Sequence, residues 1–473
     1  MMNDLDKFRE YAHKVVDRMV DYYRNVENYP VKSLVAPGDI YDLFPELPPA
    51  TGEEMDEILR DFDEKIIPGM THWQSPNFFA YFPANSSYPS VLAEMLTATL
   101  AAQCMIWETS PAAAELEEKM MNWLKQMIGL PAAWEGVIQD TASTATLASL
   151  ITAREKRSEY RINEEGFSGH ERFRIYVSTE THSSIEKGVK IAGFGRSNLV
   201  KCKVREDLSF DPEDLRARIE EDLKAGYTPL AVVATLGTTS TTAVDPLREI
   251  GEITRAYDLW LHVDAALAGS ALILPEYRWM IDGIEQADTF VFNPHKWLFT
   301  NFDCSAYFVK DREALLRTFE ILPEYLKTST HGHVNDYRDW GIPLGRRFRA
   351  LKLWFVIRSF GVSGLQAMLR EHLRLAGFIR DEVEKDPSFE LMAPVPLNTV
   401  CFRYHPENTT EEELDRLNTL LLDKVNRSGK AYFTHTRVKG KYTIRFMIGQ
   451  THTREKHVKN AWELIRTISR SLS

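Results

Sequence analysis

The sequence contains few cysteines and no long apolar run. Its 473 residues include four cysteines, which lie far apart and form no CxxC pair. This spacing fits neither a disulfide framework nor a zinc site, so the sequence predicts no metal. The most apolar stretch, residues 91–107, is interrupted by Glu94 and Gln103 and is too short to span a bilayer. Because the charged N-terminus lacks the apolar core of a secretory signal, we expect a cytoplasmic protein with no membrane partner.

Basic residues are outnumbered by acidic ones. The chain has 57 Lys and Arg against 68 Asp and Glu, and its formal net charge is −11. A phosphate-backbone binder needs a basic face, so the sequence predicts no nucleic-acid partner. Hydrophobic residues at 44% and charged residues at 26% are ordinary values for a globular protein. The length predicts about two to four domains.

The N-terminal region combines two predicted helices with an aromatic segment. Apolar residues recur at three- and four-residue steps over 3–27, which predicts an amphipathic helix, and a second helix is expected near 53–65. Residues 71–89 are rich in aromatics and are poorly suited to face solvent. A hairpin of this size is too small to close a core alone. We therefore predict that residues 1–85 form a helical dimerisation segment, swapped onto a second copy of the chain.

The central region alternates helical segments with short apolar runs. Near-continuous apolar strands between helices indicate a mostly parallel sheet covered on both faces, so we predict an α/β fold with a large domain over 86–355. A long helix is expected over 344–360. The predicted element order of the C-terminal region is then strand, helix, strand, strand, helix, which indicates a small α+β domain over 356–473. The predicted strands of the large domain are 136–139, 173–178, 229–236, 259–265, 289–293 and 305–310.

Polar residues follow five of these strands. Ligands of an open parallel sheet bind beyond the carboxyl ends of its strands, so these residues predict a site at one edge of the sheet. The residues in question are Thr141, Ala142, Ser143, His182, Thr239, Asp264, Asn293, His295 and Lys296.

Lys296 and Asp264 are the most informative of these residues. Desolvation lowers the pKa of a lysine and makes its neutral amine nucleophilic toward a carbonyl. Alone, Lys296 is more typical of a surface lysine, and Asp264 could be a helix cap. However, an aspartate at the end of an apolar strand is costly to bury without a cationic partner. Pyridoxal phosphate needs both a lysine and an acidic partner for its ring nitrogen, so the pair favours this cofactor.

The remaining positions carry weaker signals. Small and hydroxylated residues at the start of a helix, Thr141 to Ser143, suit a phosphate dianion, although such residues are usually only caps. His182 could stack on a flat cofactor or simply hydrogen-bond within a turn. The aromatic residues between Trp73 and Phe82 could be interface core or could wall a pocket for an aromatic substrate.

Four segments resemble one known family. The sequence is similar to the aromatic-L-amino-acid decarboxylases, the group II pyridoxal-phosphate decarboxylases, over about residues 4–470. This resemblance implies fold type I of the aspartate aminotransferase superfamily, decarboxylation of aromatic L-amino acids to arylalkylamines and CO₂, and an obligate homodimer with active sites at its interface. The segments are THWQSPNFFAYFPANSSYPS (71–90), LHVDAALAGSA (261–271), FNPHKW (292–297) and DYRDWGIPLGRRFRALKLWFVIRSFG (336–361).

The resemblance implies a role for each matching residue. Lys296 matches the lysine that binds the cofactor covalently, Asp264 the partner of the ring nitrogen, and His182 the imidazole stacked on the ring. Tyr325 matches the tyrosine of a mobile catalytic loop, which is expected to protonate the substrate α-carbon. The other cofactor-binding matches are Ala266, Thr141, Ala142, Ser143, Thr239, Asn293 and His295. The substrate-binding matches are Trp73, Tyr81, Phe82, Pro83, Ala84, Gln103, Met105, Trp107 and Gly345.

Several residues depart from the family pattern. Leu267 replaces a usual tyrosine, and Asp140-Thr141 replaces Gly-Ser, which places a negative charge near the phosphate site unless the carboxylate points away or bonds the backbone. Ala84 replaces a frequent threonine, and Gly345 leaves room for a bulky indole. These departures favour tryptophan or phenylalanine over hydroxylated rings.

Other functions remain open on the sequence alone. An oxidative aldehyde synthase on the same scaffold is one alternative, although some relatives of that kind carry phenylalanine where this chain has Tyr325. A cofactor-binding relative without turnover is another. Glutamate or histidine decarboxylation is also possible, but the expected substrate pocket has no obvious cation for a distal carboxylate.

Overall fold

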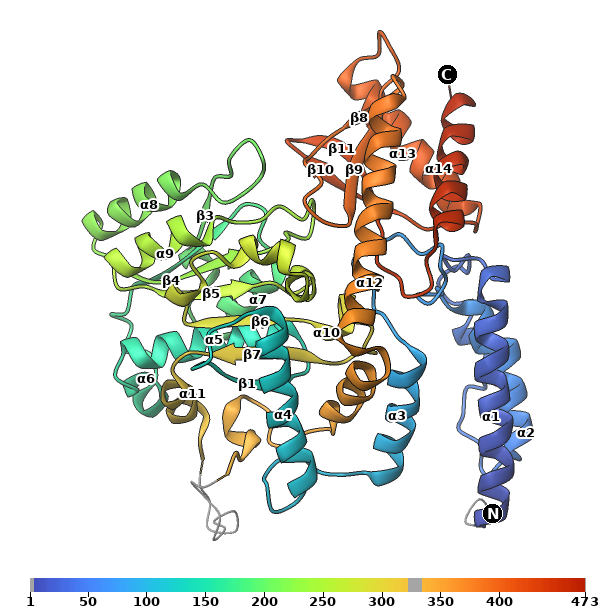
Figure 1. Ribbon diagram of the computed structural model, residues 1–473, viewed down its shortest axis with the longest axis horizontal. Helices are drawn as coiled ribbons and strands as arrows, with labels where there is room; N and C mark the ends of the chain where they lie inside the picture. Colours follow the sequence, from blue (N-terminus) through green and yellow to red (C-terminus); the bar gives the residue numbers. More distant parts are fainter. Residues whose placement is uncertain (1–3, 322–333, 473) are drawn as a thin grey trace. The chain divides into compact units, whose positions relative to one another are not determined.

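Seven strands form one sheet in the computed structural model, in the order β1-β7-β6-β5-β4-β2-β3 (Figure 1). The structure describes residues 4–321 and 334–472. Four of the strand pairs are parallel, and β7 runs antiparallel to both β1 and β6. The strands are β1 (Glu135–Gln139), β2 (Phe173–Ser178), β3 (Leu199–Cys202), β4 (Thr228–Thr235), β5 (Trp260–Asp264), β6 (Thr289–Phe292) and β7 (Ser305–Val309).

The central strands are buried on both faces, as the sequence predicts. Every residue of β5, β6 and β7 is buried, because helices cover the sheet. Apolar side chains of α5 (Ala142–Arg157) and α7 (Ser183–Ile191) pack on β2 and β4 to form one core cluster, which includes Leu150, Ile185, Ile175 and Val233. The strand β3 was not predicted, because its sequence, LVKC, is short and only its last residue is fully buried.

Several of the helices around this sheet begin at a side-chain cap. The Thr141 hydroxyl caps α5, and the Asp211 and Asp311 carboxylates cap α8 and α11. These helices are α3 (Tyr88–Leu100), α4 (Pro111–Ile128), α5 (Ala142–Arg157), α6 (Arg161–Glu165), α7 (Ser183–Ile191), α8 (Pro212–Lys224), α9 (Leu247–Ala256), α10 (Pro294–Trp297) and α11 (Arg312–Phe319).

The chain divides into two compact units. The large unit holds Ala84–Gly377 and Ala393–Val400, and the small unit holds Met1–Pro83, Phe378–Met392 and Cys401–Ser473. The predicted domains 1–85, 86–355 and 356–473 stay predictions. The predicted long helix is α12 (Arg349–Lys385), which begins later than the expected residue 344. It extends well beyond residue 360 because the chain resumes a helical course after a kink at Gly361, whose φ is 64°.

The small unit contains a four-stranded sheet in the order β10-β11-β9-β8. Its strands are β8 (Phe389–Leu391), β9 (Thr399–Tyr404), β10 (Thr434–Val438) and β11 (Lys441–Met447), and its helices include α13 (Glu411–Arg427) and α14 (Glu455–Arg470). Thr410 and Glu413 form a reciprocal cap at the start of α13. The observed order is strand, strand, helix, strand, strand, helix, so the predicted order is present with one additional strand before α13.

The same unit contains the predicted N-terminal helices, α1 (Leu5–Asn25) and α2 (Met55–Asp61). No residue of α1 is buried. Lys14 on α1 pairs with Asp56 on α2 at 2.8 Å, and Arg18 pairs with Asp63 at 3.0 Å. We call this pair of helices, with the residues up to Ile66, the α1–α2 hairpin.

Two further observations concern the whole described chain. All four cysteines are buried, and none forms a disulfide. Among residues 4–321 and 334–472, no helix has both the length and the apolar character needed to cross a bilayer.

Candidate active site

The carboxyl ends of five strands share one edge of the seven-stranded sheet. Because β7 runs antiparallel to both of its neighbours, β1 points in the same direction as β6, β5, β4 and β2. The residues that follow these five strands are those that the sequence predicts to form a site. We call this set of strand ends the carboxyl edge.

Lys296 lies on a single helical turn, α10, directly after β6. Its backbone N–H donates to the Asn293 carbonyl at 2.9 Å, and its own carbonyl accepts from the Asn85 amide at 2.6 Å. Burial lowers the pKa of the Lys296 ammonium, and the negative charge of Asp264 opposes this effect. The lysine is therefore a desolvated amine within the electrostatic reach of a carboxylate.

Asp264 is the last residue of β5 and is only 5% exposed. Its Oδ1 accepts a hydrogen bond from the backbone N–H of Ala266 at 3.0 Å. The Ala266 carbonyl in turn accepts from the backbone N–H of Asn293 at 3.0 Å. These bonds join the segment after β5 to the segment after β6. Asp264 and Lys296 therefore belong to two segments that are hydrogen-bonded to each other.

His182 caps helix α7. Its Nδ1 accepts a hydrogen bond from the backbone N–H of Ser184 at 3.2 Å, which is the turn contact that the sequence left open. Packing around the ring lowers the pKa of His182, Asp264 raises it, and Lys296 lowers it further. His182 therefore makes a contact within its turn and also lies within electrostatic reach of Asp264 and Lys296. The lowered pKa favours the neutral form of the imidazole.

The N-terminus of α5 is the expected phosphate site. The Thr141 hydroxyl accepts from the backbone N–H of Thr144 at 3.3 Å, which caps the helix. The carboxylate of Asp140, which departs from the family pattern, accepts from the backbone N–H of Thr141 at 2.6 Å. Of the two arrangements that would limit its repulsion of a phosphate, the structure shows the one in which the carboxylate bonds the backbone.

Asn293 and His295 flank Lys296 and are both buried. The Asn293 Oδ1 accepts from the Ser305 hydroxyl at 2.7 Å. The His295 Nδ1 accepts from the backbone N–H of Cys304 at 2.9 Å. Burial, with a smaller effect from Lys296, lowers the pKa of His295 to about 3, so that this ring is neutral at physiological pH.

The loop after β4 carries Thr239 and a glycine that the turn requires. Gly237 has a φ of +77°, and a Cβ there would lie 2.9 Å from the Cβ of Ala268. Asp245 holds the start of this loop: its two oxygens accept from the backbone N–H groups of Thr235 at 2.7 Å and Phe210 at 2.8 Å. Burial raises the pKa of Asp245 to about 7. Sequence reasoning missed this residue, and the only signal was an aspartate in an otherwise uncharged stretch.

A buried polar network lies beneath the carboxyl edge, and sequence reasoning missed it as well. The two ring nitrogens of His262 contact the hydroxyls of Thr146 at 2.9 Å and Thr289 at 2.8 Å. Thr289 contacts the Ser149 hydroxyl at 2.7 Å. The network links α5, β5 and β6, the elements that lead to the phosphate site, Asp264 and Lys296. Its signal in the sequence was a histidine at the centre of an apolar strand.

The predicted substrate residues fall in both units. Trp73, Tyr81, Phe82 and Pro83 belong to the small unit, where the Trp73 ring stacks on Tyr81 with ring centres 5.8 Å apart. The other five, Ala84, Gln103, Met105, Trp107 and Gly345, belong to the large unit. Tyr325 lies outside the described residues.

Within the large unit, two segments that carry substrate residues are joined. The Gln103 Oε1 accepts from the backbone N–H of Arg346 at 2.7 Å, and a Cβ on Gly345 would lie 3.4 Å from the Gln103 amide nitrogen. The structure therefore brings Gln103 and Gly345 together. Arg346 itself forms a buried two-pronged ion pair with Glu117, with its shorter contact at 2.6 Å.

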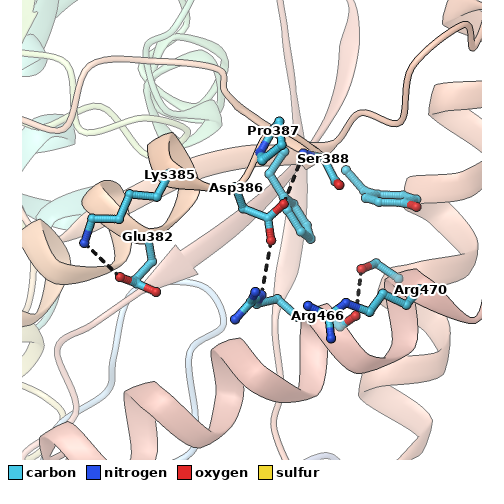
Figure 2. Close-up of a pocket in the computed structure, with 10 residues that line it drawn as sticks. Glu382, Lys385, Asp386, Pro387, Ser388, Arg466 and Arg470 are labelled. Atoms are coloured by element: carbon cyan, nitrogen blue, oxygen red, sulfur yellow. Dashed lines mark hydrogen bonds and ion pairs between the residues drawn. The ribbon is translucent and has the colours of Figure 1, made fainter.

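Trp107 lines a hollow of about 320 Å³ in the large unit, beside Glu115 and Asn122 of α4. Figure 2 shows another hollow, of about 330 Å³, which belongs to the small unit and contains none of the predicted site residues. Its charged side chains pair with one another: Lys385 with Glu382 at 3.1 Å, and Arg466 with Asp386 at 3.1 Å. We assign no role to the second hollow.

The residues of the carboxyl edge fit pyridoxal phosphate. Lys296 supplies a desolvated amine, Asp264 a buried carboxylate for the ring nitrogen, and the start of α5 a site for the phosphate. The small Ala266 leaves space beside Asp264. The buried Thr235 hydroxyl has no hydrogen-bond partner among the described residues, so the edge contains a polar atom that a bound group can satisfy.

Comparisons with known proteins point the same way. A family profile described as "Pyridoxal-dependent decarboxylase conserved domain" matches residues 37–405. The chain is 45% identical to tyrosine decarboxylase 2 of Narcissus pseudonarcissus, covering 98% of this chain and 94% of that protein. It is 44% identical to phenylacetaldehyde synthase of Arabidopsis thaliana, covering 98% and 96%. The crystal structure of an Oryza sativa protein, TDC, with PLP and tryptamine superimposes with a TM-score of 0.97 at 38% identity, covering 100% and 99%.

Proposed function

Since the chain belongs to the pyridoxal-dependent decarboxylase family, we propose that it uses pyridoxal phosphate to decarboxylate aromatic L-amino acids. The products are the corresponding arylalkylamines and CO₂. The observation that carries this proposal is the desolvated Lys296 amine beside the buried Asp264 carboxylate. Relatives named tyrosine decarboxylase and tryptophan decarboxylase, each more than 40% identical over 98% of this chain, support the aromatic substrate class.

The cofactor would be held by residues of the carboxyl edge. Lys296 would bind it covalently, Asp264 would hold a proton on its ring nitrogen, and the start of α5, with Asn293, would bind its phosphate. Pyridoxal phosphate supplies an electron sink for the pair left when a bond at the substrate α-carbon breaks. Which bond breaks depends on its orientation to the ring, so the substrate-binding residues select decarboxylation by holding the amino acid in one pose.

Other residues act on the substrate or on protons. Burial lowers the pKa of the Lys296 ammonium, which favours the neutral, nucleophilic amine. His182, with its lowered pKa, would pack on the cofactor ring as an uncharged imidazole. The Tyr325 hydroxyl, a phenol that stays protonated at neutral pH, would donate a proton to the substrate α-carbon.

Within the aromatic class, we propose a preference for tryptophan or phenylalanine. Ala84 supplies no hydroxyl for a catechol or phenol, and Gly345 leaves space beside Gln103 for a large ring. The test offers Trp, Phe, Tyr and dihydroxyphenylalanine in parallel and identifies the products by mass. A highest kcat/KM with the phenol or catechol substrate would contradict this preference while leaving the decarboxylase activity intact.

An aromatic aldehyde synthase is the alternative reaction, and one relative with 44% identity is named phenylacetaldehyde synthase. Tyr325 argues against this reaction, because some oxidative relatives carry phenylalanine at the matching position. The same assay separates the two reactions: a decarboxylase releases amine and CO₂, whereas an aldehyde synthase releases aldehyde with hydrogen peroxide. A protein that binds the cofactor but turns over no amino acid would instead support the non-catalytic alternative.

We also propose that the chain forms a homodimer with active sites at its interface. The α1 helix exposes apolar side chains that a single chain leaves in water, including Leu5 (83% exposed), Phe8 and Val20. Sedimentation of the purified chain tests the dimer directly. We propose a cytoplasmic location, which is supported by four buried cysteines without a disulfide, as expected in a reducing compartment.

A further inference from the structure

Thr235, the last residue of β4, carries a buried hydroxyl without a partner. The residue is 5% exposed, and its Oγ1 finds no hydrogen-bond partner among residues 4–321 and 334–472. A buried hydroxyl that has left water without gaining a hydrogen bond is unfavourable, so each such atom needs an explanation, and at a predicted ligand site a bound group is one. Neither the sequence pattern nor the family resemblance assigns this residue a role.

The surrounding backbone prevents the hydroxyl from finding a partner by a local shift. The backbone N–H of Thr235 donates to the Asp245 carboxylate at 2.7 Å, and its carbonyl accepts from the Asp245 N–H at 3.1 Å. The next residue, Leu236, donates to the Asp264 carbonyl at 2.9 Å. Thr235 is thus fixed on both sides, and only rotation about its Cα–Cβ bond remains.

The sheet register places Thr235 beside Asp264. The two residues are direct partners of the parallel pair β4 and β5. Paired residues of neighbouring strands project to the same face, and neighbouring strands lie about 5 Å apart. The Thr235 hydroxyl therefore shares the face from which Asp264 acts on Lys296 and His182.

The strand order gives the hydroxyl a specific counterpart. Along the carboxyl edge, the phosphate site follows β1, Lys296 follows β6, Asp264 ends β5 and Thr235 ends β4. In pyridoxal phosphate, the phosphate arm and the phenolic oxygen flank the aldehyde carbon on opposite sides. The start of α5, Lys296 and Asp264 account for the phosphate, the aldehyde and the ring nitrogen. The phenolic oxygen is the polar group that remains, on the side away from the phosphate.

We infer that Thr235 is a further cofactor-binding residue, whose hydroxyl donates a hydrogen bond to the phenolic oxygen of pyridoxal phosphate. This inference rests on the proposed function and deepens it. The inference also predicts an effect on stability. The unpaired hydroxyl destabilises the cofactor-free protein, and only bound cofactor gives it a hydrogen-bond partner.

The test compares Thr235→Val, which keeps the shape but removes the hydroxyl, with Thr235→Ser, which keeps the hydroxyl. Thr97→Val is the matched control, because the Thr97 hydroxyl is also buried and without a partner among the described residues. The full-length proteins are depleted of cofactor and titrated with pyridoxal phosphate, by absorbance for the dissociation constant. Thermal unfolding is measured with and without cofactor.

We expect Thr235→Val to bind pyridoxal phosphate about 10- to 100-fold more weakly, the effect of one hydrogen bond to a charged oxygen. Without cofactor it should unfold at the same temperature as the wild type or higher. The pH at which the absorption band of the bound cofactor changes should rise, because the phenolate loses a donor. Thr235→Ser should stay within about twofold of the wild type in affinity, and Thr97→Val should leave affinity and band unchanged.

Two results would overturn the inference. One is an unchanged affinity and pH midpoint in Thr235→Val. The other is an equal loss of thermal stability with and without cofactor, which would show that the hydroxyl serves only the fold. Failure of the wild-type protein to take up pyridoxal phosphate would overturn the proposed function together with the inference, whereas uptake by wild type and variant alike would overturn the inference alone.

Discussion

The carboxyl edge of the seven-stranded sheet and the α1–α2 hairpin place polar and apolar groups in opposite ways. At the carboxyl edge, titratable groups such as Asp245, His262 and Asp264 are buried and bonded by neighbouring groups of the same unit. In the hairpin, apolar side chains of α1 face water, and its ion pairs lie at the surface. The polar groups of the first region are bonded within its own unit, whereas the second region exposes apolar side chains that we propose are covered by a second copy of the chain.

The two regions should also differ in the size of their electrostatic effects. Charges removed from water interact strongly and shift pKa values by several units, whereas exposed ion pairs are screened and contribute little. We therefore expect substitutions at the carboxyl edge to change chemistry and pH dependence, and substitutions in the hairpin to change assembly. Four experiments probe this contrast, from the largest expected effect to the smallest.

Replacing Lys296 by alanine should abolish the function of the carboxyl edge. Loss of a covalently acting residue lowers kcat by about 10⁴-fold or more. The absorption band of covalently bound cofactor should disappear together with turnover. Borohydride reduction and peptide mapping of the wild type provide the check: the label should lie on Lys296, and a label on any other side chain would contradict the assignment.

Asp245 should make stability depend on pH. Burial raises its pKa in the folded protein from 3.8 to about 7, so between these values the folded state keeps a proton that the unfolded state has lost. Stability from this group is present below about pH 4, falls as pH rises toward 7 and then levels off, by about 4 kcal/mol in total.

Urea unfolding of wild type and Asp245→Asn at pH 5 and pH 8 measures this effect, since other groups cancel in the difference. The stability advantage of the wild type over the variant should be larger at pH 5 than at pH 8. An advantage that is the same at both pH values would show that Asp245 titrates normally.

Charging the exposed face of α1 should break assembly without breaking the fold. Phe8→Glu combined with Val16→Glu places two carboxylates where we propose that a second copy packs. We expect the dimer to dissociate about a hundredfold more readily, because buried apolar anchors dominate interface energies. Sedimentation velocity over a range of concentrations measures the shift. If the wild type already sediments as a monomer, the proposed interface is wrong.

Removing a surface ion pair of the hairpin should change little. Lys14→Ala breaks the contact with Asp56, and the side chains of these residues are 35% and 59% exposed. We expect no resolvable change in the free energy of unfolding, with cofactor binding unchanged. A loss of stability as large as that expected from a buried ion pair would mean that the hairpin shares the electrostatic character of the carboxyl edge, and the contrast between the two regions would fail.

Periodicity and strand ends predicted the parts of the fold that repeat a simple pattern. Apolar runs predicted six of the seven strands of the large sheet, and the polar residues behind them predicted its carboxyl edge. The strand β3 escaped because half-exposed edge strands carry little apolar signal. The end of α12 was misplaced because Gly361 reads as a stop, although the chain continues helically after it.

Site residues could be predicted where the chemistry requires a particular residue type. They were harder to predict where the role of a residue depends only on its neighbours in space. Lys296 and Asp264 stand out because a charged group at the end of an apolar strand is costly to bury without a partner. Asp245, His262 and Thr235 gave little signal, because their importance depends on which backbone groups and hydroxyls approach them in space. Strand order and register, which bring Thr235 beside Asp264, are long-range properties that local sequence does not encode.

The four buried thiols have a practical consequence. Burial raises the pKa of Cys104 to about 11, and that of Cys202 and Cys304 to about 12, so that neither solvent access nor ionisation favours their reaction in the native state. Alkylating reagents should therefore label each of them only when its neighbourhood opens. Cys304 follows the lysine turn, Cys202 ends β3, and Cys401 lies in β9 of the other sheet. The rate at which each thiol is alkylated thus measures local unfolding around it. Mass spectrometry can follow this rate separately for each cysteine.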